Sequence, residues 1–563
     1  MSRRSLWAGG WAKTAGMDQS PTRASTTQPQ IRAAQDAFDR LTFLGWRWGL
    51  TAIVAGMAAS FLLFGYALIY WRNADMDFMV IYNALVLNDG KPQRFFDHTG
   101  YITILSVKVW FELLHSLGLL NSYSLSTIPP ASDPAAFDAA MTAAVRVGRV
   151  LAFLIATGSV LVFAALLRTI VRDWRVALLA TLAFAFSGGV AVHSRILRTE
   201  LVAACPVIFA LLILIVIGRR ASVARPLGMA VAAALCVLGL ENKVQVILLI
   251  GALPVLVLPF GGAESASVPF WRHARSGWPA AMVAAIAALA AAWAARPLIA
   301  TGFDRALLDV AQFHPLLLSR FGIYQAVLIV VTGGCMTAYA VIWRVSAAET
   351  LASMCAIAAG ASVALLALNL EYNTSNVIAV FNPLEKMLTF ADADASAAAS
   401  GSSPSGILWL LLDGLASVLA RYTFVLHSSP RPTVFLTWLI VPGIIWARSR
   451  GEKQTAIQAL VLLLAAAGID ALGVRRGLKS EYFIFTDPLI ILAGAILLDG
   501  LADLRFHRWT YPIAMVLFGL HIAIGQSEPV KYAFMRKGPE SICEWNRHYL
   551  PLLPLPWCPP APL

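Results

Sequence analysis

The sequence contains little charge for its length, since Asp, Glu, Lys and Arg make up only 13% of its 563 residues. Soluble globular proteins carry about 25% of these residues, so the composition excludes a water-soluble protein. Hydrophobic residues account for 59% of the chain, and the mean hydropathy is +0.71. These values predict an all-α polytopic membrane protein.

Cysteine is also scarce, and none of the six residues lies in a CxxC motif or at a zinc-ligand spacing from His, which excludes a structural zinc site. Two cysteines, Cys543 and Cys558, lie outside the apolar runs and flank a Pro-rich segment. We predict that they form a disulfide in an oxidising compartment, worth about 3 kcal/mol by loop-closure entropy. The other four lie in apolar runs, where a thiol packs as a small apolar group: Cys205, Cys236, Cys335 and Cys355.

The N-terminal residues 1–47 lack the apolar core of a cleavable signal peptide and are rich in Arg, Ser, Thr and Gln. This composition predicts a disordered cytoplasmic tail. The formal net charge is +12, yet most Lys and Arg residues lie in short segments between apolar runs. Because no soluble basic domain carries this charge, nucleic acid is excluded as a partner.

Apolar runs of spanning length follow the tail, about thirteen by hydropathy and helix length. They cover residues 48–71, 147–167, 176–194, 200–218, 225–241, 244–260, 278–300, 321–343, 349–369, 432–447, 455–473, 482–500 and 510–525. With a cytoplasmic N-terminus, each internal connection contains Lys or Arg, as the positive-inside rule requires. We therefore predict a transmembrane domain over residues 48–526 and an external C-terminal tail over 527–563.

This orientation places the long connections 72–146, 301–320 and 370–431 outside the cell. The first holds apolar residues at helical spacing and predicts two amphipathic helices that lie along the interface. The third contains an Ala/Ser/Gly-rich stretch that indicates a flap or a linker. Function should therefore face outward.

Acidic residues are concentrated where the first span ends, at Asp75 and Asp77. Asp77 opens the helical segment DFMVIYNALVLNDG, so the helix dipole favours its ionised form, and an ionised carboxylate can act as a general base toward a hydroxyl. Two alternatives stay open: the acids are solvated loop residues, or the pair binds a divalent cation through oxygen ligands.

The first loop resembles that of the GT-C superfamily of glycosyltransferases, which use polyprenyl-phosphate sugars and include aminoarabinose and mannosyl transferases. The resemblance lies in one span followed by an acid in DFxxIYNA and then by FFDHTGY before a second helix. It implies a catalytic acid at Asp77 with Asp75 as its neighbour, although the adjacent Asp-Glu pair of many members is missing. We expect the first-loop residues Asp97, His98 and Tyr82 to contact substrate.

Two further stretches fit the same resemblance. SRILRTELVAA, residues 194–204, implies a supporting catalytic role for Glu200, with Arg195 and Arg198 available to anionic groups. LENKVQVILL, residues 240–249, places Lys243 where the family often has a lysine, which would bind the donor phosphate. The alternatives are that the first stretch only caps a helix and that the lysine extends to the interface.

A late external segment, VRRGLKSEYFIFTDP at residues 474–488, carries basic residues where the positive-inside rule disfavours them. Guanidinium groups bind phosphate oxygens in pairs, so Arg476 and Lys479 are predicted to bind the donor phosphate. General attraction to anionic headgroups is the alternative. The resemblance adds Tyr482 as a substrate contact.

Together these patterns predict an inverting glycosyltransferase that moves a sugar from a polyprenyl-phosphate donor to a lipid or polysaccharide acceptor on the external face of a bacterial inner membrane. An acid deprotonates the acceptor while cations stabilise the departing phosphate. No cofactor is expected apart from a possible divalent cation at Asp75 and Asp77. The competing class is a transporter or flippase of a lipid-linked anion, which also needs cations and intramembrane polar groups.

Overall fold

The structure is a computed structural model that describes residues 27–73, 77–92, 100–262, 266–306, 322–370, 380–381, 383, 404–423, 434–473, 480–501, 509–534, 543 and 550–559. Within these ranges the chain forms helices and turns and contains no β-strand. A helix satisfies its own backbone hydrogen bonds, which is what a chain in lipid requires. The predicted all-α class is confirmed.

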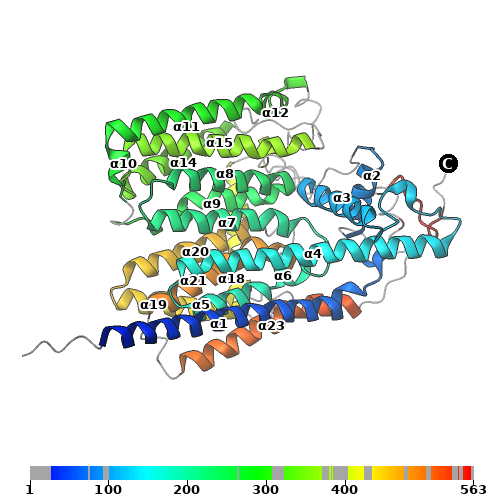
Figure 1. Ribbon diagram of the computed structural model, residues 1–563, viewed down its shortest axis with the longest axis horizontal. Helices are drawn as coiled ribbons and strands as arrows, with labels where there is room; N and C mark the ends of the chain where they lie inside the picture. The colour runs from blue at the N-terminus through cyan, green and yellow to red at the C-terminus, as the bar shows by residue number, and fades with distance from the viewer. Residues whose placement is uncertain are drawn as a thin grey trace, which may run out of the picture. The chain divides into compact units, whose positions relative to one another are not determined.

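The helices shown in Figure 1 occupy the following ranges: α1 (Thr27–Phe61), α2 (Met79–Asn88), α3 (Tyr101–Ser116), α4 (Pro134–Ile170), α5 (Trp174–Ala185), α6 (Gly188–His193), α7 (Glu200–Arg219), α8 (Arg225–Asn242), α9 (Ile247–Val257), α10 (Pro269–Arg272), α11 (Ala274–Ala294), α12 (Arg296–Gly302), α14 (Gly322–Ile342), α15 (Ala347–Leu365), α18 (Pro404–Thr423), α19 (Val434–Ser449), α20 (Lys453–Gly473), α21 (Asp487–Gly500) and α23 (Thr510–Phe534). Two short helices are also named here: the π-helix η1 (Leu62–Tyr66), which follows α1, and the 3-10 helix η11 (Ser480–Phe485), which precedes α21.

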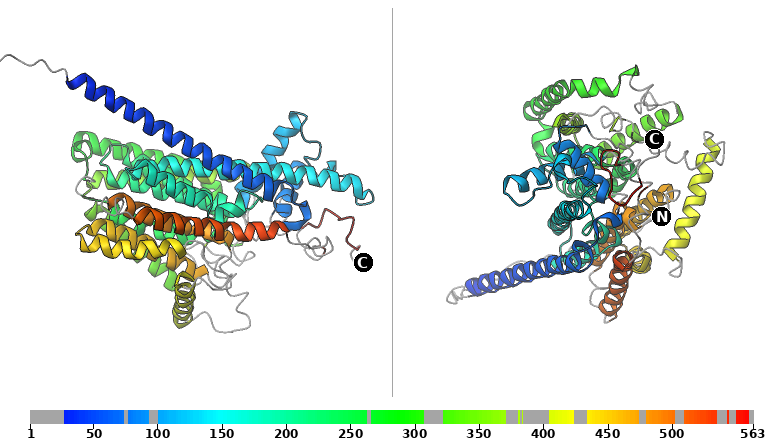
Figure 2. Two further views of the ribbon diagram at one scale, coloured as in Figure 1. Left: turned by 90° about the horizontal axis from the view of Figure 1, so that it is seen from below. Right: turned by 90° about the vertical axis from the view of Figure 1, so that its right-hand side faces the viewer.

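The chain divides into two units, Met1–Trp48 and Gly49–Leu563. In the first unit the described part is helical from Thr27, so the predicted disordered tail over residues 1–47 is wrong for nearly half of its length. This segment is rich in Ala, Gln, Arg and Leu, which favour a helix more than its polar composition suggests. In the second unit most of the long helices run side by side, whereas α18 lies across their direction (Figure 2).

Six helices among the described residues are long and apolar enough to cross a membrane. They are Leu44–Tyr66, Pro134–Ile170, Glu200–Arg219, Ala274–Ala294, Ala347–Leu368 and Lys453–Ala471. Other helices, among them α8 and α21, occupy the remaining ranges in which the sequence predicts spans. An integral membrane protein is therefore supported, while the count of thirteen spans stays a prediction.

Helix α8 packs between α7 and α15, and glycine makes both contacts close. A side chain at Gly360 of α15 would collide with the carbonyl of Ala230 in α8, and one at Gly239 of α8 would meet the carbonyl of Ala203 in α7. Small residues of this kind let membrane helices approach closely and gain van der Waals contact. The α7–α8 contact fixes the end of α8 against the start of α7, where polar residues gather.

The first loop does contain two helices, α2 and α3, but the predicted interfacial position is wrong for α2. Its residues from Met79 to Leu87 are all buried. They form one apolar cluster, which we call the first-loop core, with α3, the start of α4 and the distant residues Leu550, Leu553 and Leu555. The Tyr82 hydroxyl accepts a hydrogen bond from the Leu552 N–H at 3.2 Å. Because a C-terminal segment covers α2, this helix has no exposed face that could contact lipid.

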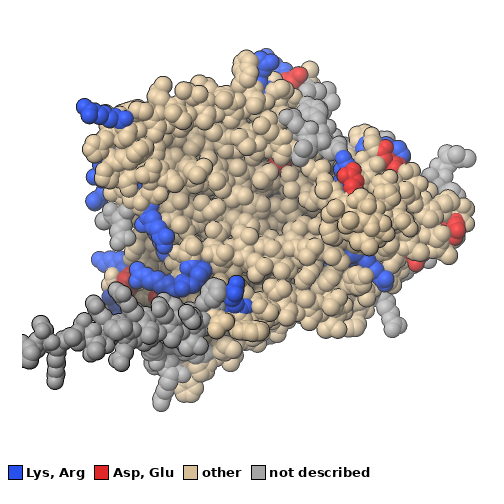
Figure 3. Space-filling model, in the orientation of Figure 1, with Lys and Arg blue, Asp and Glu red and all other residues tan. Residues whose placement is uncertain are grey.

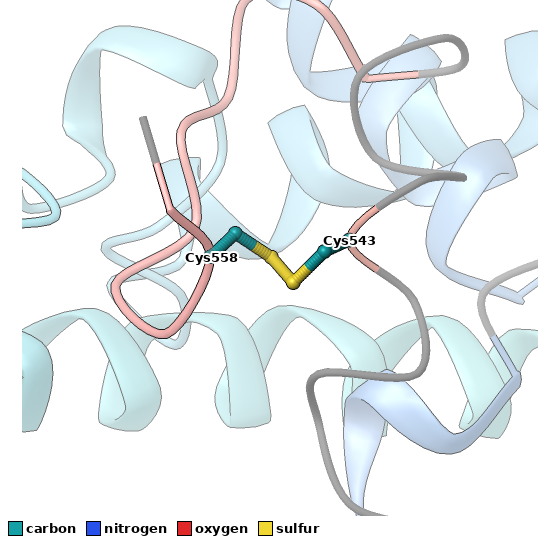
Figure 4. The surroundings of a disulfide bond; sticks show 2 residues. All are labelled: Cys543 and Cys558. Atoms are coloured by element: carbon teal, nitrogen blue, oxygen red, sulfur yellow. A yellow bond between two sulfur atoms is a disulfide. The ribbon is translucent and has the colours of Figure 1, made fainter. Parts of the chain in front are cut away.

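The disulfide predicted between Cys543 and Cys558 is confirmed, with a Cα–Cα distance of 5.4 Å (Figure 4). Cys558 also packs against the first-loop core. The bond therefore ties the segment that covers α2 to the chain 15 residues before it. It closes a loop around the covering leucines.

Charged residues are sparse on the face of the molecule in Figure 3, where most of the described surface is uncharged. Large apolar side chains are exposed on several helices, for example Leu63 at 71% and Leu289 at 72%. Such exposure suits contact with lipid acyl chains rather than water. By contrast, several ionisable residues are fully buried, and these define the candidate site.

Candidate functional site

The candidate site lies where α6, the start of α7, the end of α8 and η11 meet. Helix α8 ends because Lys243 adopts an extended backbone, with φ −157° and ψ 127°. Glu200 begins α7, and its preceding residue makes no side-chain cap. The helix ends thus bring one acidic and several basic side chains together from segments that are separate in the sequence.

Glu200 is the centre of this group, and three cationic or polar side chains surround it. The Lys243 ammonium donates to Glu200 Oε1 at 2.5 Å, and Arg198 Nη2 donates to the same oxygen at 3.1 Å. The His193 Nε2 atom lies 3.3 Å from Glu200 Oε2. Glu200 and Lys243 are fully buried, whereas the Arg198 side chain keeps 9% of its surface exposed. We call these four residues the Glu200 cluster.

The Glu200 cluster contains two cations, Lys243 and Arg198, and one carboxylate. Arg198 also interacts electrostatically with Asp77, so Glu200 is not its only acidic neighbour. A buried group of this kind, richer in cations than in carboxylates, favours the approach of an anion. Arg198 is the member through which such an anion would arrive, because it alone reaches the surface.

Asn242 holds the end of α8 in position beside the cluster. Its side-chain oxygen accepts hydrogen bonds from the Thr103 N–H at 3.0 Å and from the Thr103 hydroxyl at 2.9 Å. Its side-chain amide donates to the Thr199 carbonyl, and its own carbonyl accepts from the Gly100 N–H at 2.8 Å. Gly100 has a φ of +55°, which a glycine adopts without strain. The first loop is thereby bound to α7 and α8 at the site.

Tyr482 borders the cluster from η11. The Lys243 ammonium lies 5.3 Å from the centre of its ring, within the range of a cation–π interaction. Helix α6 touches the same segment, because a side chain at Gly189 would collide with the backbone of Ile484. The partly exposed Tyr482 ring and Arg198 thus form the accessible edge of an otherwise buried group.

Asp77 forms a buried ion pair of its own, close enough to Arg198 to interact with it electrostatically. Its Oδ2 accepts a hydrogen bond from Arg149 Nε at 2.7 Å, and its Oδ1 accepts one from the Leu197 N–H at 3.2 Å. Both side chains have no exposed surface. Burial raises the pKa of the Asp77 carboxyl, and the Arg149 guanidinium and the Leu197 N–H oppose this because they favour the ionised form. Asp77 therefore anchors the 194–199 turn, which carries Arg198 toward Glu200.

Arg195 comes from the same turn but points to other helices. Its Nη2 donates to the Ser60 hydroxyl of α1 and to Gln526 Oε1 of α23. Burial lowers the pKa of Arg195 to about 10, so the group stays charged at neutral pH. The structure therefore separates Arg195 from Arg198 and Lys243, with which the sequence grouped it as a phosphate ligand.

The remaining predicted site residues are Asp75, Asp97, His98, Arg476 and Lys479, and all of them lie outside the described residues. Within the described part of the chain, no three His, Cys, Asp or Glu side chains come close enough to hold a metal ion. This finding does not bear on the predicted metal site at Asp75 and Asp77, because Asp75 lies outside the described residues.

Sequence reasoning missed three residues of this region: His193, Asn242 and Arg149. Asn242 directly precedes Lys243 in the segment LENKVQVILL. Its position beside a predicted site residue was the signal by which it could have been found. His193 directly precedes the segment SRILRTE, but nothing in the sequence indicated which residue it would contact. Arg149 lies inside a predicted span, and an arginine there is expected to pair with a buried acid.

Searches against protein-family models, curated proteins and solved structures found no match to this chain.

Proposed function

We propose that this protein is a membrane glycosyltransferase that moves a sugar from a polyprenyl-phosphate donor to a lipid or polysaccharide acceptor. The observation that supports the proposal best is the Glu200 cluster, a buried group in which two cations share one carboxylate and which has one accessible edge. We place the protein in a bacterial inner membrane with its N-terminus in the cytoplasm, as the distribution of Lys and Arg predicts.

The donor phosphate binds at Lys243 and Arg198 in this proposal. The oxygens of a phosphate ester accept strong hydrogen bonds from an ammonium and a guanidinium. The phosphate competes with Glu200 for these two cations, because Lys243 donates to Glu200 Oε1 and Arg198 donates to both carboxylate oxygens. Donor binding thus releases the Glu200 carboxylate from its partners.

The released carboxylate of Glu200 then serves as the base. It takes the proton of the acceptor hydroxyl as the hydroxyl oxygen attacks the anomeric carbon from the side opposite the phosphate. The bond from the anomeric carbon to the phosphate oxygen breaks, and its electron pair leaves with the polyprenyl phosphate, whose charge Lys243 and Arg198 stabilise. The anomeric configuration inverts. Asp77 contributes by holding the 194–199 turn through Leu197.

The test uses purified full-length protein in lipid vesicles with polyprenyl-phosphate esters of tritiated mannose and aminoarabinose. We expect sugar to leave the donor for a bacterial lipid or polysaccharide acceptor. Glu200→Gln should lower turnover about 10²- to 10⁴-fold, the usual effect of losing a general base, while donor still binds. Lys243→Met should weaken donor binding. As a matched control, Arg296→Gln removes an arginine that stacks on Trp293 away from the cluster.

A transporter of a lipid-linked anion is the second candidate, because α8 breaks off at Lys243 and a new helix begins directly afterwards. Discontinuous helices at a buried charge are typical of secondary transporters. Movement of intact donor across the vesicle membrane, without sugar release from either donor, would favour this candidate and contradict the glycosyltransferase proposal.

A further inference from the structure

Arg195 is a buried cation without an anionic partner in the described part of the chain. It is 3% exposed, and its Nε and Nη1 atoms are buried without a hydrogen-bond acceptor among those residues. Its Nη2 has only neutral acceptors, Ser60 and Gln526. The Phe64 ring covers the guanidinium at 5.4 Å. By contrast, the nearby Arg149 has a carboxylate at 2.7 Å.

A charge held this way is unfavourable unless an anion joins it. The two unsatisfied nitrogen atoms are donors, and a guanidinium presents its donors in a plane that matches the oxygens of a phosphate. The covering ring of Phe64 is itself partly exposed, so a rotation of that side chain opens the guanidinium to its surroundings. The required ligand is thus an oxyanion at the end of the first span.

An apolar groove lies along α1 and α5, toward the N-terminal end of α1 from this position. It has a volume of about 540 Å³ and is lined by Gly49, Ala52, Ile53, Trp174, Leu178 and Phe186, among others. The Phe186 carbonyl accepts a hydrogen bond from the Gln526 side chain at 3.4 Å, and Gln526 in turn accepts from Arg195. Phe186, which packs against Gly56 at this end of the groove, thus connects it through Gln526 to the guanidinium. The lining residues on α1 run from Gly49 to Ile53, and Ser60 lies about 10 Å further along the helix.

We propose that Arg195 and this groove bind one phospholipid of the surrounding bilayer, with the phosphate at the guanidinium and an acyl chain in the groove. The phosphate lies at the end of the span Leu44–Tyr66, and the chain runs back along it, which is how a lipid is oriented in a bilayer. The exposed side chains of Leu62 and Leu63, at 60% and 71%, place the site beside bulk lipid. This proposal does not rest on sugar transfer.

The test is native mass spectrometry of the full-length protein, delipidated in neutral detergent and titrated with dipalmitoyl phosphatidylglycerol. We expect one tightly bound lipid on the wild type, and at least about tenfold weaker binding by Arg195→Gln, because hydrogen bonds to a charged group are lost. Ala52→Phe fills the groove and should weaken binding without touching the guanidinium. Arg195→Lys keeps the charge but loses the planar donors, so it should fall between wild type and Arg195→Gln.

Two controls separate the phosphate from the rest of the lipid. Dipalmitoylglycerol lacks the phosphate and should bind at least about tenfold more weakly to the wild type. Arg296→Gln removes an arginine that stacks on Trp293, outside the groove, and should bind like the wild type. Wild-type affinity in Arg195→Gln, or equal binding of the two lipids, would overturn the proposal. Preference for polyprenyl phosphate over phosphatidylglycerol would overturn the assignment to a bilayer phospholipid.

Discussion

Replacing Asp77 by Asn tests whether this carboxylate holds the structure together or performs chemistry. The sequence alone predicts a folded but inactive variant. The structure predicts a folding defect, because the Arg149 guanidinium would remain buried at 0% exposure with only carbonyl acceptors. Removing one partner of a buried ion pair typically costs about 3–5 kcal/mol. We therefore expect Asp77→Asn to lower the free energy of unfolding by an amount in this range.

The measurement is unfolding of the purified protein in mixed micelles with increasing dodecyl sulfate, followed by tryptophan fluorescence. Arg149→Met in the Asp77→Asn background removes the stranded charge and should recover part of the loss. Glu112→Gln is the matched control, since this acid is half exposed and its ion pair among the described residues is a 4.0 Å surface contact with Lys108; such pairs contribute about 0–1 kcal/mol. If Asp77→Asn were as stable as wild type but unable to transfer sugar, the structural role would be refuted and Asp77 would be the base.

Two further predictions concern the segments around the first-loop core. Cys543 and Cys558 should resist alkylation in membranes isolated without reductant, and Cys558→Ser should lower stability by about 3 kcal/mol, the loop-closure estimate for a 15-residue separation; full labelling without reductant would contradict this. Burial acts to raise the pKa of Asp89, but hydrogen bonds from Ser126 and Lys91 lower it below its ordinary 3.8. A lowered folded-state pKa gives stability that is present above 3.8 and is lost as the pH falls through the folded value. The protection of the Ser126 amide against exchange should therefore fall in wild type as the pH drops through the folded value, whereas its protection in Asp89→Asn should not change across this range.

Much of the helical pattern follows from the sequence because lipid leaves the backbone few choices. An apolar run must form a helix there, and the ranges predicted from hydropathy are occupied by helices such as α7, α15 and α20. The disulfide was predictable for a similar reason, since Cys543 and Cys558 are the two cysteines outside apolar runs. These inferences use only local composition.

The contacts within the site join residues that are far apart in the sequence, so local composition could not predict them. Glu200 and Lys243 are 43 residues apart, and their hydrogen bond exists because α7 and α8 pack at Gly239. Asp77 sits at a loop start that looks exposed, yet Arg149 lies 72 residues further along and covers it. An acid next to a span gives the same sequence pattern whether water or a distant arginine contacts it, so the burial of Asp77 could not be predicted from its neighbours.

The covering of α2 by the C-terminal segment has a consequence for how the protein is made. Tyr82 bonds to a residue 470 positions later, so the first-loop core stays open while the ribosome completes almost all of the chain. The leucines that close it lie inside the loop sealed by Cys543 and Cys558, which requires an oxidising compartment. Completion of the first loop is thus delayed until the last helices are inserted and the thiols are oxidised. An unoxidised or prematurely terminated chain would present α2 to quality-control proteases at the membrane.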